Sequence, residues 1–282
     1  MKPNRVAIAV LVILLIPVLP QALLPANGHP ADGKAAPGVR VARQESKPQN
    51  VVAPGTAASS DLADLEGRAD LQMARKEYAE AAKTYKQLVV QAPKNPVYLN
   101  KLGIAYHQQT MLSVAQRFYE KAAKADPQYA DALNNIGTVY YQRKKYGKAV
   151  RYYRKALQIR ETMPAVYCNL GYAYFSEKHY VEAMDAFQRA VQLDPAVFDH
   201  SSRTGSILQD RSLVGERGMF NFLLAKSYAQ MGNAERCAHY LRKARDEGYS
   251  SIAKVKDDPA FAAVLRDPGV QEALQTEAEK KP

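Results

Sequence analysis

The sequence predicts an all-α fold in which pairs of helices stack into an α-α superhelical solenoid. The first observation is a 34-residue period, which is typical of stacked repeats. The second is the helical spacing of the apolar residues inside each period. The third is a set of small and aromatic residues that recur in fixed columns: Gly103, Gly137 and Gly171; Tyr106, Tyr140 and Tyr174; Ala115, Ala149 and Ala183; Tyr119, Tyr153 and Phe187; Ala122, Ala156 and Ala190.

These columns resemble the tetratricopeptide repeat, whose pattern has small residues at positions 8, 20 and 27, tyrosine at 11 and an aromatic residue at 24. Units that begin at Pro96, Ala130 and Pro164 match this pattern closely, and weaker units begin at Leu62 and Gly218. The resemblance implies a protein-binding scaffold with two helices per unit. Together with the N-terminal segment described below, it makes the chain similar to exported bacterial members of that family.

The packing of a unit follows from these residue types. Small side chains at positions 8, 20 and 27 let the two helices of a unit approach closely, and we expect the aromatic residues at 11 and 24 to fill the space between units. No unit can bury its apolar stripe alone, so neighbouring units must stack. Each unit therefore contributes to one continuous core.

The chain divides into a targeting segment, a linker, the repeats and a cap. The predicted regions are residues 1–24, a signal peptide or membrane anchor; 25–60, a disordered linker rich in Pro, Ala and Gly; 61–251, the repeats, with units 62–95, 96–129, 130–163, 164–197 and 218–251 and an insertion at 198–217; and 252–282, C-terminal capping helices and a tail. We expect Asp61 to cap the first helix. Asp258-Pro259 and Asp267-Pro268 each predict the start of a short capping helix.

The first residues have the character of a targeting segment. Lys2 and Arg5 precede an unbroken apolar run of eleven residues, Val6–Ile16. This run is short for a membrane span, which needs about 20 residues, and long enough for the apolar core of a signal peptide. A cleaved signal peptide and a retained anchor both stay open. Either one predicts an exported protein, periplasmic or secreted, or anchored in the inner membrane and facing the periplasm.

The inner faces of the first helices are the expected binding surface, because the family resemblance implies that positions 2, 5, 6, 9, 12 and 13 line a groove. Asparagine amides suit the donors and acceptors of a peptide backbone, and aromatic rings add apolar contact. The predicted partner-binding residues are Asn100, Ile104, His107, Asn134, Asn135, Thr138, Tyr141, Asn169, Tyr172 and Phe175. The alternative is that these side chains only solvate the groove.

The second helix of the third unit carries a basic patch that we expect to point outward. The net charge is +11, and residues 62–195 hold 20 basic and 13 acidic side chains. The patch consists of Lys144, Lys145, Lys148, Arg151, Arg154 and Lys155. One interpretation is a solvated surface. The other is a membrane-tethered assembly factor that binds anionic lipid or an acidic partner. Nucleic acid is not expected, because the sequence contains no base-reading module.

No catalytic or metal-binding pattern is present in the sequence. It lacks a glycine-rich phosphate loop, a paired-cysteine motif and a nucleophile motif, and its five histidines do not have metal-ligand spacing. We therefore predict a protein that is not an enzyme and that requires neither cofactor nor metal. Cys237 is expected in the core, and Cys168 is expected as a free thiol in the groove.

Overall fold

The computed structural model describes residues 54–198 and 216–275, with side chains from residue 61 onward. All of the described residues belong to one compact unit, and residues 1–51 lie outside the described part of the chain. The predicted targeting segment, most of the 25–60 linker and most of the 198–217 insertion lie outside the described residues.

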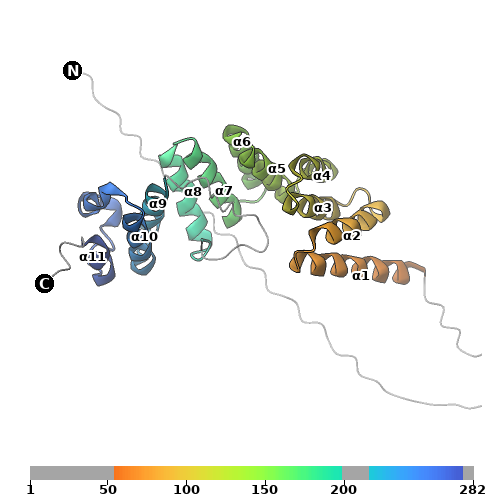
Figure 1. Ribbon diagram of the computed structural model, residues 1–282, viewed down its shortest axis with the longest axis horizontal. Coiled ribbons are helices and arrows are strands. Elements are labelled where there is room, and N and C mark those ends of the chain that lie inside the picture. The colour runs from red at the N-terminus through yellow and green to blue at the C-terminus, as the bar shows by residue number, and fades with distance from the viewer. Residues whose placement is uncertain (1–53, 199–215, 276–282) are drawn as a thin grey trace, which may run out of the picture. The chain divides into compact units, whose positions relative to one another are not determined.

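Five helix pairs follow one another along the described chain (Figure 1). They are α1 (Pro54–Ala74) with α2 (Tyr78–Gln91), α3 (Pro96–Gln108) with α4 (Leu112–Ala125), α5 (Ala130–Gln142) with α6 (Tyr146–Ile159), α7 (Pro164–Ser176) with α8 (Tyr180–Leu193), and α9 (Arg217–Gln230) with α10 (Ala234–Asp246). The short segments η2 (Ser250–Asp257), η3 (Pro259–Phe261) and α11 (Pro268–Leu274) follow.

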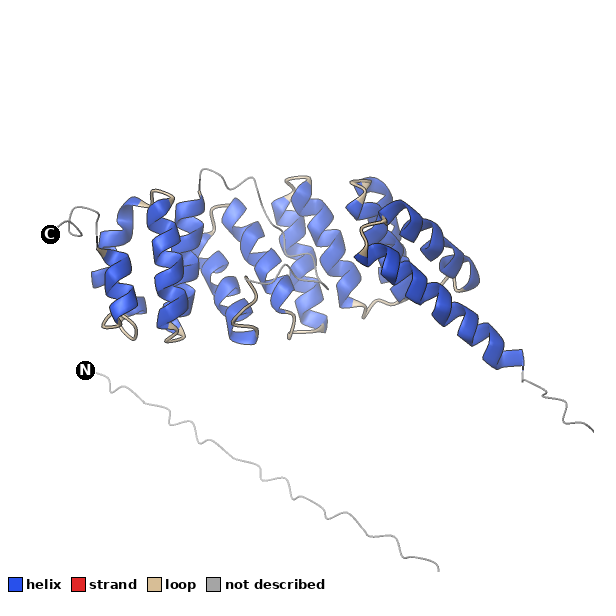
Figure 2. Cartoon of the chain, turned by 60° about the horizontal axis from the view of Figure 1, so that its bottom comes forward, coloured by secondary structure: helices blue, strands red, loops and turns tan. Residues whose placement is uncertain are grey.

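The helices pack in the order of the chain. The two helices of each pair contact each other, and the second helix of each pair contacts the first helix of the next. The cap packs on the fifth pair, through α11 against α10 and η3 against α9. All regular structure among the described residues is helical (Figure 2). The predicted all-α solenoid with a C-terminal helical cap is confirmed.

The helices of one pair meet where a glycine faces an aromatic ring. A Cβ atom added to Gly137 on α5 would lie 2.6 Å from a ring carbon of Tyr153 on α6, which is closer than side chains tolerate. Tyr153 itself is fully buried. The same relationship recurs in the neighbouring units, between Gly103 and Tyr119 and between Gly171 and Phe187. The predicted close approach at position 8 is therefore confirmed. The ring at position 24, expected between units, instead packs against the glycine of its own unit, because the absent side chain leaves room for it there.

Each helix pair turns at a residue with left-handed backbone. This residue occupies position 15 of every unit, and φ is 63° at Lys76, 62° at Thr110, 56° at Lys144, 62° at Lys178 and 71° at Gly232. A left-handed backbone is costly for every residue type except glycine. Four units adopt it without glycine, so the packing of the helix pair imposes the turn geometry.

Two local expectations are corrected by the structure. α1 begins at Pro54, so Asp61 lies inside the helix rather than at its N-cap. Proline suits the first position of a helix, because a backbone N–H there would have no partner within the helix and proline lacks that N–H. Cys168 is fully buried within α7 instead of facing a groove, because side chains at position 5 pack against the neighbouring unit. Cys237 is buried as expected, and both thiols are free.

The aspartate caps at the C-terminal end are confirmed. The Asp258 side chain accepts a hydrogen bond from the backbone N–H of Ala260 at 3.0 Å. Asp267 accepts hydrogen bonds from the backbone N–H groups of Gly269 and Val270. Both therefore fix the start of a short helical segment, η3 and α11 respectively.

Candidate partner-binding face of the first helices

The ten predicted groove residues lie on α3, α5 and α7, the first helices of three consecutive units. Eight of them are buried, with exposed fractions of 8% or less. Ile104 and His107 are half-buried. The structure thus brings these residues together, mainly as packed side chains between the helices. Their role in partner binding stays a prediction.

Four buried asparagines form a hydrogen-bonded chain that crosses all three helices, which we call the amide ladder. Asn135 donates to the amide oxygen of Asn100 at 2.9 Å, and Asn169 donates to that of Asn134 at 3.0 Å. Asn134 in turn donates to Asn135 at 3.3 Å, which joins the two contacts. Because buried amides are costly unless paired, the ladder requires these partners in this register.

The ladder contacts follow a simple rule of position. Each joins position 6 of one unit to position 5 of the unit before it, and so connects residues 35 apart. No buried side-chain nitrogen or oxygen among the described residues lacks a hydrogen-bond partner. The asparagines are thus engaged with their neighbours in the stack.

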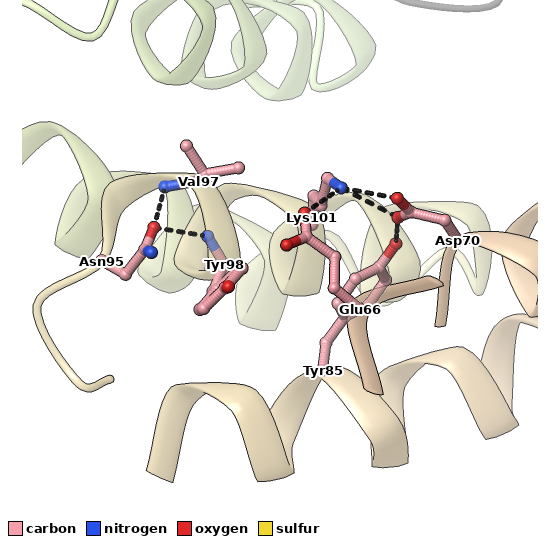
Figure 3. Close-up of polar contacts among 7 residues, drawn as sticks. All are labelled: Glu66, Asp70, Tyr85, Asn95, Val97, Tyr98 and Lys101. Atoms are coloured by element: carbon pink, nitrogen blue, oxygen red, sulfur yellow. Dashed lines mark hydrogen bonds and ion pairs between the residues drawn. The ribbon is translucent and has the colours of Figure 1, made fainter. Parts of the chain in front are cut away.

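The interface between the first and second units uses charges at the same two positions (Figure 3). The ammonium nitrogen of Lys101, at position 6, lies 2.7 Å from a carboxylate oxygen of Glu66, at position 5, and 2.8 Å from one of Asp70. Tyr85 donates to Asp70 as well. Burial opposes the charge on Lys101, but the hydrogen bonds to Asp70 and Glu66 outweigh it and raise the pKa of the ammonium group.

This ionic cluster was missed in the sequence analysis. A signal for it does exist, because Glu66 and Lys101 are opposite charges 35 residues apart at positions 5 and 6. The pKa of the Tyr85 phenol is raised, first by burial and then by its hydrogen bond to Asp70. The Tyr85 phenol therefore stays neutral beside the contact between Lys101 and Asp70.

A second set of contacts joins the same helices near their C-terminal ends. The His107 Nε2 lies 2.8 Å from the Gln142 amide oxygen, and the Tyr141 hydroxyl lies 2.9 Å from the Ser176 hydroxyl. Both contacts join position 12 of one unit to position 13 of the next. His107 also approaches the Tyr119 hydroxyl through Nδ1 at 3.1 Å. Burial lowers the pKa of His107, so its ring is neutral at pH 7.

At positions 5 and 6, the interface between the fourth and fifth units is apolar instead. Position 5 of the fourth unit is Cys168 and position 6 of the fifth is Leu223, and both are buried. Phe220 on α9 packs against Tyr172 and Phe187, with ring centroids 5.3 Å and 5.5 Å away. The amide ladder therefore ends at the fourth unit.

The basic patch lies on α6 and the turn before it. All six of its side chains are exposed, so their predicted outward orientation is confirmed. No ion pair joins any of them to another described residue. The Lys148 ammonium lies 5.4 Å from the centre of the Tyr140 ring, and that of Lys155 lies 5.6 Å from Tyr152. These two rings stack on each other at 5.4 Å.

Residues 54–198 and 216–275 contain neither a metal-ligand cluster nor a membrane-spanning helix. Within these ranges no cluster of three or more His, Cys, Asp or Glu side chains is arranged to hold a metal ion. None of the helices in the same ranges combines the length and the apolar character needed to cross a membrane.

Family models match the repeats along most of the described chain. Tetratricopeptide repeat models match residues 66–95, 97–129, 118–151 and 164–196, and a TPR repeat model matches residues 137–177. A curated relative is the heat-shock protein cognate co-chaperone sgt12 of Aspergillus fumigatus, which is 34% identical over 101 residues. The matched segment is 36% of this chain and 28% of that protein.

Two solved structures are similar at low sequence identity. MamA from Desulfovibrio magneticus is 19% identical, with a TM-score of 0.46, and the match covers 67% of this chain and 96% of that one. YrrB, described as a TPR protein with an unusual peptide-binding site, is 20% identical, with a TM-score of 0.43 and coverage of 66% and 86%.

Proposed function

Because the chain belongs to the tetratricopeptide repeat family, we propose that it is a protein-interaction scaffold of a bacterial cell envelope that binds a partner segment along the inner faces of its first helices. Binding, rather than catalysis, is the function that this architecture suits best. A co-chaperone is among the proteins that the repeats resemble, and this agrees with a protein partner.

The register of α3, α5 and α7 is the observation that carries the proposal. Asn135–Asn100, Asn169–Asn134, His107–Gln142 and Tyr141–Ser176 all join residues 35 apart. An equal separation places equivalent positions of the three helices beside one another, so their accessible side chains form one track. Since the ladder amides are buried, the partner contacts fall on the more accessible residues beside them: Val97, Ile104, His107, Gln108, Gln142 and Ser176.

Paired charge variants test this track. Val97 and Gln108 are exposed on α3. The control residues Val90 and Gln158 are the same two residue types, and they are exposed on the second helices α2 and α6. Partners are first identified by crosslinking from an envelope extract, and their affinity is then measured with purified protein. Val97→Glu with Gln108→Glu is expected to weaken binding, while Val90→Glu with Gln158→Glu leaves it unchanged. Equal affinities for both variants would remove the track as the binding site.

The envelope location rests on residues 1–24, with Lys2 and Arg5 ahead of the apolar run. A fusion of residues 1–60 to a reporter that is active only outside the cytoplasm tests it. An active reporter is expected, and a silent one contradicts export. Mass spectrometry of the mature N-terminus then distinguishes a cleaved signal peptide from a retained anchor.

A second candidate function uses the basic patch, in a membrane-tethered assembly factor that binds anionic lipid or an acidic partner. The favouring observation is that six exposed cations, from Lys144 to Lys155, have no ion pair with a described residue. Such attraction is screened by salt. Arg151→Glu with Lys155→Glu is expected to abolish binding to anionic vesicles or to polyglutamate at low salt if this candidate holds.

A further inference from the structure

We propose a second binding site in the hollow between α8, α9 and η3, where the protein takes a neutral, extended peptide segment through one apolar side chain. The proposal deepens the scaffold function above and rests on it, but it places the contact at the fifth unit and the cap. None of the ten predicted groove residues lines this hollow.

The hollow is open and has a volume of about 610 Å³. Small-molecule pockets in proteins span about 300–1,000 Å³, so the space is ample for one side chain. Met184 and Gln188 line it from α8, and Lys226 and Gln230 line it from α9. The last two hold positions 9 and 13 of their unit, which belong to the same face as the predicted groove. The hollow therefore continues that face beyond the end of the amide ladder.

The charges in the hollow cancel one another. The Lys226 ammonium lies 2.7 Å from Oδ2 of Asp258, and Oδ1 of Asp258 accepts a hydrogen bond from the Ala260 N–H. Both carboxylate oxygens are thus engaged, and the two side chains are only 24% and 21% exposed. A charged segment would have to break this pair to gain a partner, so charge complementarity favours a neutral one.

Two glutamine amides in the hollow are available to a ligand. The side chains of Gln188 and Gln230 have no hydrogen-bond partner among the described residues, in contrast to the asparagines of the amide ladder. Each amide offers two donors and an acceptor, which match the C=O and N–H groups of an extended backbone. These amides supply the orientation for a peptide segment.

The remaining lining is apolar and small. Ala229, Ala260, Ala262 and Ala263 leave the space open, and Met184 adds a side chain that adapts to irregular shapes. This space suits one apolar side chain of the ligand, while its backbone lies along the two glutamines. The chemistry of the ligand is therefore a neutral peptide with an apolar anchor.

The full-length protein tests this with three pools of capped peptides that share a central leucine and carry neutral, acidic or basic flanks. Binding is measured by fluorescence anisotropy at low and at physiological salt. We expect the neutral pool to bind most tightly and with little dependence on salt. Ala263→Trp fills the hollow and is expected to weaken this binding about tenfold or more. Ala125→Trp, at an exposed alanine at the end of α4, is the matched control.

The glutamines are tested in the same way. Gln188→Ala with Gln230→Ala is expected to weaken binding of the neutral pool, and Gln158→Ala, exposed on α6, leaves it unchanged. Unchanged melting temperatures show that the variants fold. Wild-type affinity of Ala263→Trp, or tighter binding of a charged pool, would overturn the proposal. So would a photo-crosslinker at position 263 that captures residues 199–215 of the chain itself in place of added peptide.

The two proposals fail in different ways. If Val97→Glu with Gln108→Glu abolishes binding of the envelope partner and Ala263→Trp does not affect any peptide, the scaffold function stands and the hollow is not a site. If neither set of variants changes binding, both proposals fail.

Discussion

The Asn135 side chain donates a hydrogen bond to the amide oxygen of Asn100 across the interface between the second and third units, at 2.9 Å. Both side chains are buried, with exposed fractions of 6% and 4%. Asn135 also accepts a hydrogen bond from Asn134, so it connects the two halves of the amide ladder. Three neighbouring first helices thus depend on one amide group.

Asn135→Ala is expected to lower the free energy of unfolding by about 1–3 kcal/mol, because it leaves the oxygen of Asn100 and an N–H of Asn134 buried without this partner. Chemical denaturation measures the effect. Gln158→Ala, at an exposed glutamine, serves as the control and should change stability by no more than about 0.5 kcal/mol. Equal stability of both variants would show that the ladder contributes nothing.

Gly137→Ala is expected to destabilise the third unit by about 1–3 kcal/mol, because the new Cβ would overlap the Tyr153 ring. Gly67→Ala is the opposite case, since nothing lies within 4 Å of its added Cβ inside α1. It should raise stability by about 0.5–1 kcal/mol through the better helix propensity of alanine. Thermal melts compare the two, and a change of the same sign in both would contradict the packing described.

Thr110→Gly is expected to raise stability, and Gly232→Ala is expected to lower it, each by about 1 kcal/mol. Both residues hold position 15 with φ near the left-handed region, 62° and 71°. A β-branched residue is poorly suited to this conformation, whereas glycine adopts it freely. Differential scanning calorimetry measures both variants. A destabilising Thr110→Gly would mean that the threonine side chain makes a contact worth more than the backbone strain.

Acidification is expected to destabilise the protein through His107. Burial lowers its pKa in the folded state below the ordinary value of 6.5, so the unfolded chain binds the proton more readily. Stability from this group is therefore complete above pH 6.5 and is lost as the pH falls through that value toward the lowered pKa. His107→Gln should flatten this part of the stability curve from pH 7 to pH 5. An unchanged slope in the variant would assign the loss to other groups.

The period of the sequence predicts the contacts within a unit well and those between units poorly. Gly137 and Tyr153 belong to recurring columns. Because glycine has no side chain, it leaves room for the large tyrosine ring, and the two residues meet. Asn135 and Asn100 stand in different columns, and an asparagine on a helix suits solvent, a ligand or another asparagine equally. Only the offset between stacked units decides among these, and it depends on tertiary packing.

The same reason explains the two residues that were misplaced. Cys168 shares position 5 with Asn100 and Asn134, but it faces an apolar fifth unit, so it is buried without an amide partner. Asp61 has the chemistry of an N-cap, yet the helix continues back to Pro54, since helix starts are weakly determined by a single residue. Neither outcome could be read from one unit alone.

The contacts between units at positions 5 and 6 also restrict the order in which the repeats can be arranged. The third unit carries asparagine at both positions, as Asn134 and Asn135, so a duplicated copy would find a matching neighbour on either side. The second unit presents Lys101 instead, and it requires the carboxylates of Glu66 and Asp70 from the unit before it. Placed after the third unit, that lysine would meet an amide and remain a poorly compensated charge. A copy of the third unit can therefore be inserted beside it, whereas the second unit cannot be moved behind the third without leaving Lys101 poorly compensated.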